Sequence, residues 1–173
     1  MDYQARILLD SLLTNGKLTE VEIEKLKIEA VSKGVDIITY LLQKEVIKDK
    51  DVLEAKSKIL GVPLFLDSRL TVSPEILSLV TTDLAKNYSV IPYSLDKAKK
   101  ELVLIMVHPE DHSAVDFFEK RTGYKVSTML TSQENYEVLL NFVYNQSLTG
   151  EISSVLKRGN KDTGDDNGVR LVT

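Results

Sequence analysis

The stretch ILLDSLLTNGKLTEVEI, residues 7–23, decides the fold, because its apolar pattern returns 29 residues later as DIITYLLQKEVIKDKDV, residues 36–52. Within each copy, apolar residues recur at intervals of three and four, which is typical of amphipathic helices. Leu12 in the first copy corresponds to Leu41 in the second. Duplicated apolar positions at one offset predict two copies of a helical hairpin, each burying its apolar stripe against the other.

Start and stop signals divide this region into helices. Thr19 and Glu22 have the spacing of a capping box, which predicts the start of a second helix. Gly34 and Gly61 stand where glycine commonly ends a helix. After the first helix, which ends before Asn15-Gly16, the expected helices span roughly 19–33, 36–44 and 49–60.

The periodicity changes to a strand pattern from Tyr88 onward. Two apolar runs around the polar residues 96–100 predict a β-hairpin. Pro109 and Asp111 predict the start of a helix, and Thr131 with Glu134 predicts the cap of a last helix. The expected order is strands 88–94 and 101–107, a helix to Arg121, a strand over 124–130 and a helix to about Asn145. The fold class is therefore predicted as α+β: tandem helical hairpins followed by a small ββαβα sheet subdomain.

Four segments follow from these patterns. Residues 1–61 form the helical-hairpin subdomain, 62–87 a connector with short helices, and 88–145 the ββαβα subdomain. In the connector, Ser73-Pro74 predicts a helix over 75–80. Residues 146–173 are rich in glycine and acidic side chains, which predicts a flexible linker. The last apolar residues, 169–172, suggest the approach to a further domain.

Composition excludes several functional classes. The 173 residues include no cysteine, which rules out disulfides, thiolate metal sites and a cysteine nucleophile, and favours the cytoplasm. The N-terminus has no signal-peptide pattern, and the longest apolar run, Leu102 to Val107, is too short to cross a bilayer. The net charge is -4 and the Lys and Arg residues are spread evenly, so the sequence indicates no basic patch for binding nucleic acid. We expect neither nucleic-acid binding nor direct membrane insertion.

Catalytic motifs are absent from the sequence. None of the eight glycines belongs to a phosphate-binding loop that ends in Gly-Lys-Ser/Thr, and there is no Gly-x-Ser-x-Gly nucleophile elbow. We therefore expect this chain not to be an enzyme and to need no cofactor.

The two histidines form the one constellation with possible metal chemistry. His108 and His112 are spaced as i and i+4 with carboxylates between them, so they could bind a metal if both lay on one helical turn. His108 precedes a proline and is expected to end a strand, whereas His112 falls in the first turn of the next helix. A strand-to-helix junction is the favoured interpretation, with metal binding as the alternative.

The combined pattern resembles the N-terminal domain of the ATPases that power type II secretion and type IV pilus assembly. The resemblance covers roughly residues 5–145 and lies in the order of several short segments. These segments are Gly16-Lys17-Leu18-Thr19-Glu20, Lys33-Gly34, Ile59-Leu60-Gly61-Val62-Pro63, residues 84–92, His108-Pro109-Glu110-Asp111 and Arg121-Thr122-Gly123-Tyr124. By implication the parent protein is an ATPase, its catalytic core follows this chain, and this chain contacts that core.

Some members of this family bind cyclic di-GMP through the same tandem repeat, with an Arg-Leu-Gly triplet and a turn glycine in each copy. Here Ile7-Leu8-Leu9 and Asp36-Ile37-Ile38 occupy the triplet positions. The departures in charge and size predict that cyclic di-GMP is not bound. The motif positions, of which Gly16 alone is retained, are Ile7, Leu9, Gly16, Ala30, Asp36, Ile38 and Glu45.

The resemblance implies a docking role. Members of the family dock this domain onto the cytoplasmic part of an inner-membrane platform protein, which couples the motor to pilus or pseudopilus growth. We therefore expect a cytoplasmic, non-catalytic domain that is peripheral to the inner membrane through its partner. The alternative is a cyclic di-GMP-sensing regulatory domain of the same ATPase family.

Overall fold

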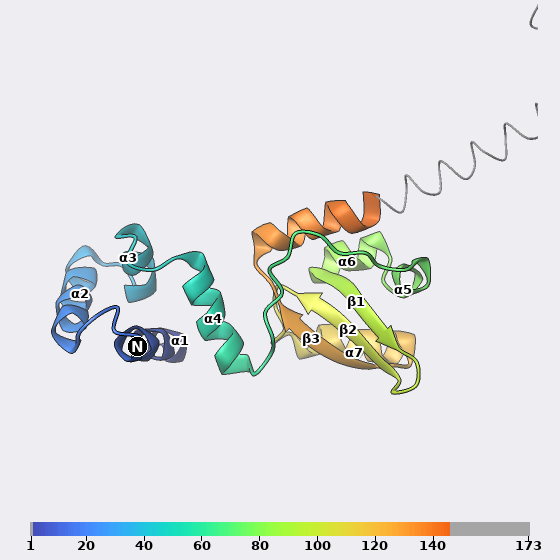
Figure 1. Cartoon of the computed structure of the whole chain (residues 1–173), viewed down its shortest axis with the longest axis horizontal. Helices are drawn as coiled ribbons and strands as arrows, with labels where there is room; N and C mark the ends of the chain where they lie inside the picture. The colour runs from blue at the N-terminus through green and yellow to red at the C-terminus, as the bar shows by residue number, and fades with distance from the viewer. Residues whose placement is uncertain (1, 146–173) are drawn as a thin grey trace, which may run out of the picture.

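The computed structural model describes residues 2–145, which form an α+β fold. The N-terminal part contains four helices, α1 (Tyr3–Thr14), α2 (Glu20–Lys33), α3 (Ile37–Gln43) and α4 (Asp49–Leu60). Figure 1 shows α1, α2 and α3 at one end of the molecule, with α4 between them and the sheet. The four helices confirm the elements predicted from the two copies of the repeat.

The backbone repeats the pattern of the sequence at the same offset of 29 residues. After α1, Lys17 N donates to Leu12 O at 3.0 Å, and after α3, Val46 N donates to Leu41 O at 2.9 Å. Because equivalent donors reach equivalent acceptors, the turns that leave α1 and α3 have one geometry. The tandem repeat is therefore present in the backbone conformation as well as in the sequence.

The starts of α2 and α4 are also equivalent. At α2, Thr19 and Glu22 form the predicted capping box, in which Thr19 N donates to Glu22 Oε2 at 2.8 Å. At α4, Lys48 N donates to Asp51 Oδ2 at 2.8 Å. In each helix a carboxylate in the first turn satisfies the N-cap amide, which has no partner within the helix.

The helical part has a hydrophobic core of its own. Helix α1 packs against α4, and α2 packs against α3, so each copy of the repeat contacts the other. The buried residues come from all four helices and are Leu8, Leu9, Leu12, Ile23, Leu41, Ile47 and Ala55. Except for Ala55, they are among the apolar positions that the repeat predicts as the core.

The connector contains two short helices, α5 (Pro74–Leu79) and α6 (Thr82–Tyr88). Helix α5 begins with Pro74 at its first turn, as predicted. Helix α6 extends to Tyr88 and ends at Ser89, whose φ is 53°. The predicted strand start at Tyr88 is therefore wrong: this residue is the last of a helix, and the strand begins at Val90.

The C-terminal part contains a three-stranded sheet in the order β1-β2-β3. Strands β1 (Val90–Asp96) and β2 (Glu101–Met106) are antiparallel, whereas β3 (Lys125–Leu130) is parallel to β2. The parallel connection runs through α7 (His112–Thr122), which lies behind the sheet in Figure 1. The predicted ββα order is confirmed.

A last helix is described over residues 133–145. Its N-cap is Ser132, whose Oγ accepts the amide hydrogen of Asn135 at 3.0 Å. The predicted cap at Thr131 is therefore wrong. Thr131 is instead buried, and its amide donates to Met106 O at 3.0 Å, which ties the residue after β3 to the end of β2.

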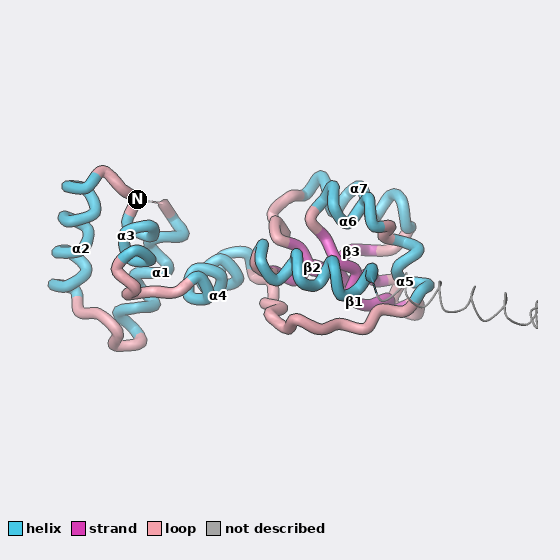
Figure 2. The backbone as a smooth tube through the Cα atoms, turned by 90° about the horizontal axis from the view of Figure 1, so that it is seen from above, coloured by secondary structure: helices cyan, strands magenta, loops and turns pink. Residues whose placement is uncertain are grey.

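The sheet part has a second core, formed by the sheet and the helices that cover it. Its buried residues share no member with the core of the helical part. They are Phe65, Val80, Ala85, Val90, Ile91, Leu102, Leu104, Ile105, Met106, Val107, Ala114, Phe118, Val126, Tyr136, Leu139, Val143 and Tyr144. Figure 2 shows α4 joining the two parts of the chain.

Within residues 2–145, no helix is both long enough and apolar enough to cross a membrane.

Candidate functional site

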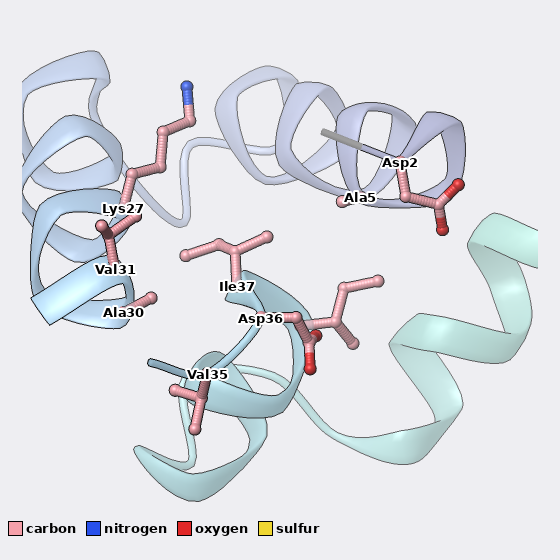
Figure 3. A pocket seen from close by; sticks show the side chains of 9 residues that line it. Asp2, Ala5, Lys27, Ala30, Val31, Val35, Asp36 and Ile37 are labelled. Carbon is pink, nitrogen blue, oxygen red and sulfur yellow. The ribbon is translucent and has the colours of Figure 1, made fainter. Parts of the chain in front are cut away.

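An apolar pocket lies in the helical part, between the start of α1, the C-terminal half of α2 and the start of α3. Its volume is about 490 Å³, which is within the range of small-molecule pockets. Figure 3 shows Ile37 pointing into the space between α1 and α2. The lining residues are Asp2, Ala5, Lys27, Ala30, Val31, Val35, Asp36, Ile37 and Ile38.

The end of α2 shapes one wall of this pocket. Gly34 ends the helix with a φ of 67°, a left-handed conformation that glycine adopts without cost. Val35 N then donates to Ala30 O at 3.2 Å, so the chain turns back on the last turn of α2. The turn places Val35 beside Ala30 and Val31, and the next residues begin α3.

Asp36 lies at the rim of the pocket and begins α3. Its Oδ1 accepts the amide hydrogen of Thr39 at 2.9 Å, and its Oδ2 accepts the Thr39 hydroxyl. These hydrogen bonds from Thr39 lower the pKa of the Asp36 carboxyl group, because they favour the charged form. Asp36 is therefore an N-cap residue that presents negative charge at the pocket.

The packing of α2 against α3 is fixed by a buried tyrosine. Tyr40 is 2% exposed, and its hydroxyl donates to Glu29 Oε2 at 2.7 Å. Lys44 Nζ lies 3.3 Å from the same carboxylate. The Tyr40 hydroxyl, and then Lys44, lower the pKa of Glu29. This polar cluster holds α3 at a fixed position against the helix that supplies a third of the pocket lining.

The single cation of the pocket lining already has a partner. Lys27 Nζ lies 2.7 Å from Glu24 Oε1, one turn earlier on α2. The other two charged lining residues, Asp2 and Asp36, are both acidic. The pocket therefore offers an apolar interior and a rim whose unpaired charges are negative.

An exposed apolar surface adjoins the pocket. Val31 lines the pocket and is nevertheless 79% exposed, and Ile28, one turn earlier on α2, is 69% exposed. Tyr3, at the start of α1, is 62% exposed. Apolar side chains that cluster at the surface beside a pocket are typical of sites that contact another molecule.

Three of the seven motif positions come together at this pocket. Ala30, Asp36 and Ile38 line it, whereas Ile7 and Leu9 pack into the core of the helical part. The remaining two lie in the turns after α1 and α3. There Gly16 and Glu45 both adopt positive φ, 68° and 57°, respectively.

The histidine pair is placed at the junction of β2 and α7. His108 follows β2 and is exposed, with its Nδ1 3.6 Å from Glu110 Oε1. His112 is the first residue of α7, behind an N-cap at Asp111, whose Oδ1 accepts the amide hydrogens of Ser113 and Ala114. Within residues 2–145, no group of three or more His, Asp or Glu side chains is arranged to hold a metal ion.

Comparison with known proteins decides the family. The model of the MshEN domain family matches residues 60–150. The chain belongs to the MshEN domain family. The family comprises N-terminal domains of type IV pilus and type II secretion ATPases, as the sequence resemblance predicts.

Two curated proteins have sequences similar to this MshEN chain, both type IV pilus assembly ATPases named PilB. The protein from Myxococcus xanthus is 29% identical over 126 residues, which are 72% of this chain and 22% of that protein. The protein from Thermus thermophilus is 21% identical over 126 residues, which are 73% of this chain and 14% of that protein. The chain therefore spans less than a quarter of the length of either relative.

The fold is also found in a solved structure of MshE with cdg. The two chains superpose with a TM-score of 0.55 at 16% identity, covering 78% of this chain and 96% of the other. At this level of identity the similarity shows a shared fold.

Sequence reasoning missed most of the pocket lining. Ile23, Leu26 and Ala30 mark the inner face of α2, but Val21, Ile28 and Val31 form a second apolar set on its outer side. The available signal was the presence of two apolar faces on one helix. A helix that packs against the core on one side needs only one apolar face, so the second indicates a further contact.

Proposed function

We propose that this chain is a non-catalytic docking domain of a secretion or pilus assembly ATPase. In this proposal it binds the cytoplasmic part of an inner-membrane platform protein and so couples the motor to the machinery. The observation that supports it is the apolar pocket beside exposed Val31, in a chain whose residues 60–150 match the MshEN domain family.

The pocket suits an apolar side chain of a protein partner. Its interior is lined by alanine, valine and isoleucine, and Val31 and Ile28 extend the apolar surface onto α2. Protein interfaces are commonly centred on an apolar or aromatic anchor that fills such a pocket, with near-neutral contacts around it. An amphipathic helix of the partner provides such anchors at helical spacing.

The proposal also includes the setting of the domain. The parent protein is an ATPase, whose catalytic core follows this chain and contacts it. The domain is cytoplasmic and becomes peripheral to the inner membrane through the platform protein. The homology to pilus and secretion ATPases supports this setting.

Two exposed valines of α2 allow a matched test. Val31 lines the pocket and Val21 does not, yet each is 79% exposed. Binding of the platform protein's cytoplasmic domain would be measured by isothermal titration calorimetry for Val31→Gln and Val21→Gln. We expect Val31→Gln to weaken binding about tenfold, since burying a valine contributes about 1.5 kcal/mol or more. Val21→Gln is expected to change the affinity by less than about twofold.

Equal affinities of the two variants would exclude the pocket as the docking site. Absence of any binding by the unchanged chain would contradict the docking function itself. Thermal unfolding of both variants checks that the fold is kept, and glutamine is suitable here because its helix propensity is at least that of valine.

The second candidate function is cyclic di-GMP sensing. It is favoured by one observation: Ala30, Asp36 and Ile38, at the motif positions of the family, line the same pocket. The charges argue against it, because Asp2 and Asp36 at the rim repel a dianion and Lys27 is paired with Glu24. Titration of labelled cyclic di-GMP tests this. Binding tighter than about 10 μM, worth roughly 7 kcal/mol, would favour the sensing function over docking alone.

A further inference from the structure

A group of exposed cations gathers at the end of the sheet that is formed by the β1–β2 turn. We call this group the basic end. It consists of Lys99, Lys100, Lys120, Arg121 and Lys125, all of them exposed.

The topology brings three separate segments together there. Lys99 and Lys100 belong to the turn between β1 and β2, and Lys125 begins β3. Lys125 N donates to Lys100 O at 2.9 Å, which joins the start of β3 to that turn. Lys120 and Arg121 lie in the last turn of α7, which leads directly into β3. Because β3 is parallel to β2, α7 has to return to the end of the sheet at which β2 begins.

The side chains of the basic end carry uncompensated charge. Within residues 2–145, none of the five forms a salt bridge. Another cation of the same turn, Lys97, pairs with Glu75 at 2.5 Å. That pairing shows that a salt bridge is possible at this place, and it excludes Lys97 from the basic end.

The nearby carboxylates are engaged with other donors. Asp96 Oδ1 accepts the amide hydrogen of Lys99 at 3.0 Å, and Glu119 Oε1 accepts that of Val126 at 3.0 Å. Glu101 accepts the hydroxyl hydrogen of Ser127. These carboxylates therefore support the turn, the end of α7 and the strand, and the cations point to solvent without them.

The basic end carries positive charge, whereas the chain as a whole is negative, and it lies far from the apolar pocket. The chain as a whole has a net charge of -4. Figure 1 shows the β1–β2 turn and the end of α7 on the side of the sheet that faces away from α1, α2 and α3. The basic end is therefore a surface separate from the pocket.

We propose that the basic end is a second interaction surface, which binds an acidic segment of another protein. Arg121 supplies a planar guanidinium that can hold a carboxylate through two hydrogen bonds, and the four lysines supply point charges around it. Opposite charges on the two surfaces speed association and fix the orientation of the partner.

The surface fits a protein better than a membrane or a nucleic acid. None of the large apolar residues that are exposed within residues 2–145 lies in the segments of the basic end, so it has no anchor for a bilayer. Asp96 precedes Lys99 and Glu101 follows Lys100 along the chain, so two carboxylates adjoin the cations and oppose a uniformly charged phosphate backbone. A patterned acidic segment can avoid these two carboxylates.

Fluorescence anisotropy of the full chain tests the proposal with a defined probe, a labelled peptide in which glutamate alternates with serine. The variant Lys99→Gln/Lys120→Gln/Arg121→Gln removes three charges of the basic end. We expect it to weaken peptide binding at least about tenfold, and we expect binding by the unchanged chain to weaken as salt is added. A second peptide with glutamine in place of glutamate should not bind.

The matched control removes three lysines elsewhere. Lys25, Lys58 and Lys86 are exposed and without a salt bridge in the described part of the chain. Their replacement by glutamine changes the net charge by the same amount. We expect this control variant to bind the acidic peptide within about twofold of the unchanged chain, because its basic end is intact.

Equal weakening in both triple variants, or no binding of the acidic peptide, would overturn the proposal. So would tighter binding of phosphatidylglycerol vesicles or of duplex DNA, which form the other two arms of the experiment. The outcome is independent of the docking test, since the platform assay reports on Val31 and the peptide assay on the basic end.

Discussion

At the scale of single residues, Glu45 adopts a conformation that its side chain makes costly. Its φ of 57° lies in the left-handed region, where Gly16 sits at the equivalent turn of the first copy with a φ of 68°. A residue with a Cβ loses roughly 1 kcal/mol there, whereas glycine does not. The second turn therefore stores strain that the first avoids.

The two turns predict opposite effects of reciprocal substitutions. Glu45→Gly should raise the free energy of unfolding by about 0.5–1 kcal/mol, and Gly16→Ala should lower it by about 1 kcal/mol. A Cβ at Gly16 meets nothing within 4 Å, so its cost is purely conformational. Urea unfolding measures both, and a loss of stability in Glu45→Gly would mean that the Glu45 side chain contributes more than its strain costs.

Residue types alone predict part of the candidate site. The repeat located the motif positions, and Ala30, Asp36 and Ile38 do meet at the pocket. The sequence predicts that a helix begins near Asp36, but not that the Asp36 side chain is its N-cap. Val31 and Val35 were not predicted either, since their proximity depends on how the chain turns back after Gly34.

At the scale of elements, the last helix holds the connector through two buried tyrosines. Tyr136 donates its hydroxyl hydrogen to Ala85 O at 2.7 Å, and Tyr144 donates to Val80 O at 2.6 Å. Ala85 lies in α6, and Val80 follows α5. Burial raises the pKa of both phenols, most strongly that of Tyr144. The folded chain therefore favours the neutral phenols.

This preference predicts a loss of stability in alkali. The stabilisation is complete below pH 10, the ordinary pKa of tyrosine, and declines as the pH rises towards the raised pKa of the folded state. Each phenol adds a slope of up to about 1.4 kcal/mol per pH unit to the free energy of unfolding. Lysine titration contributes in the same range, so the variant Tyr136→Phe/Tyr144→Phe isolates the phenols.

The phenylalanine variant is expected to lose about 1 kcal/mol per hydrogen bond at neutral pH, because two carbonyl groups each lose one donor. Its stability should then fall less steeply above pH 10 than that of the unchanged chain. Denaturant unfolding at a series of pH values compares the slopes, and parallel slopes would show that the phenols do not titrate as proposed.

Most elements were predictable from the sequence because their ends carry local signals. Thr19, Gly34 and Gly61 mark helix ends, and the structure uses each of them for that purpose. The bounds of helix α6 were not predicted. Its start has no side-chain cap, and it ends at Ser89, although serine seldom adopts the positive φ found there. The parallel position of β3 depends on long-range pairing, which local periodicity does not specify.

At the scale of the whole molecule, the two hydrophobic cores share no buried residue. Within residues 2–145, one salt bridge joins the helical part to the sheet part, between Lys56 of α4 and Glu110 after β2, with Nζ 3.0 Å from Oε1. Its side chains are 25% and 45% exposed, so its contribution to stability is small. We propose, in line with the predicted segments, that the two parts unfold as separate units.

Leucines that are 0% exposed in each core allow a direct test. Leu41 belongs to the helical core and Leu104 to the core of the sheet part. Replacement by alanine should cost about 2–5 kcal/mol in either core. We expect hydrogen exchange to accelerate within residues 3–60 for Leu41→Ala and within 90–143 for Leu104→Ala. Acceleration of both regions by either variant would show a single cooperative unit.

The end of α4 at Gly61 has a mechanical consequence. Helix α4 has 12 residues, which at 1.5 Å per residue gives a rod about 18 Å long. Gly61 ends the rod with a φ of 66°, and a Cβ there would meet nothing within 4 Å. A rotation of about ten degrees at this glycine moves the far end of the rod by about 3 Å, by the same helix geometry. A rotation at Gly61 would therefore carry the pocket, at the far side of α4, through a larger displacement than the residues next to the glycine.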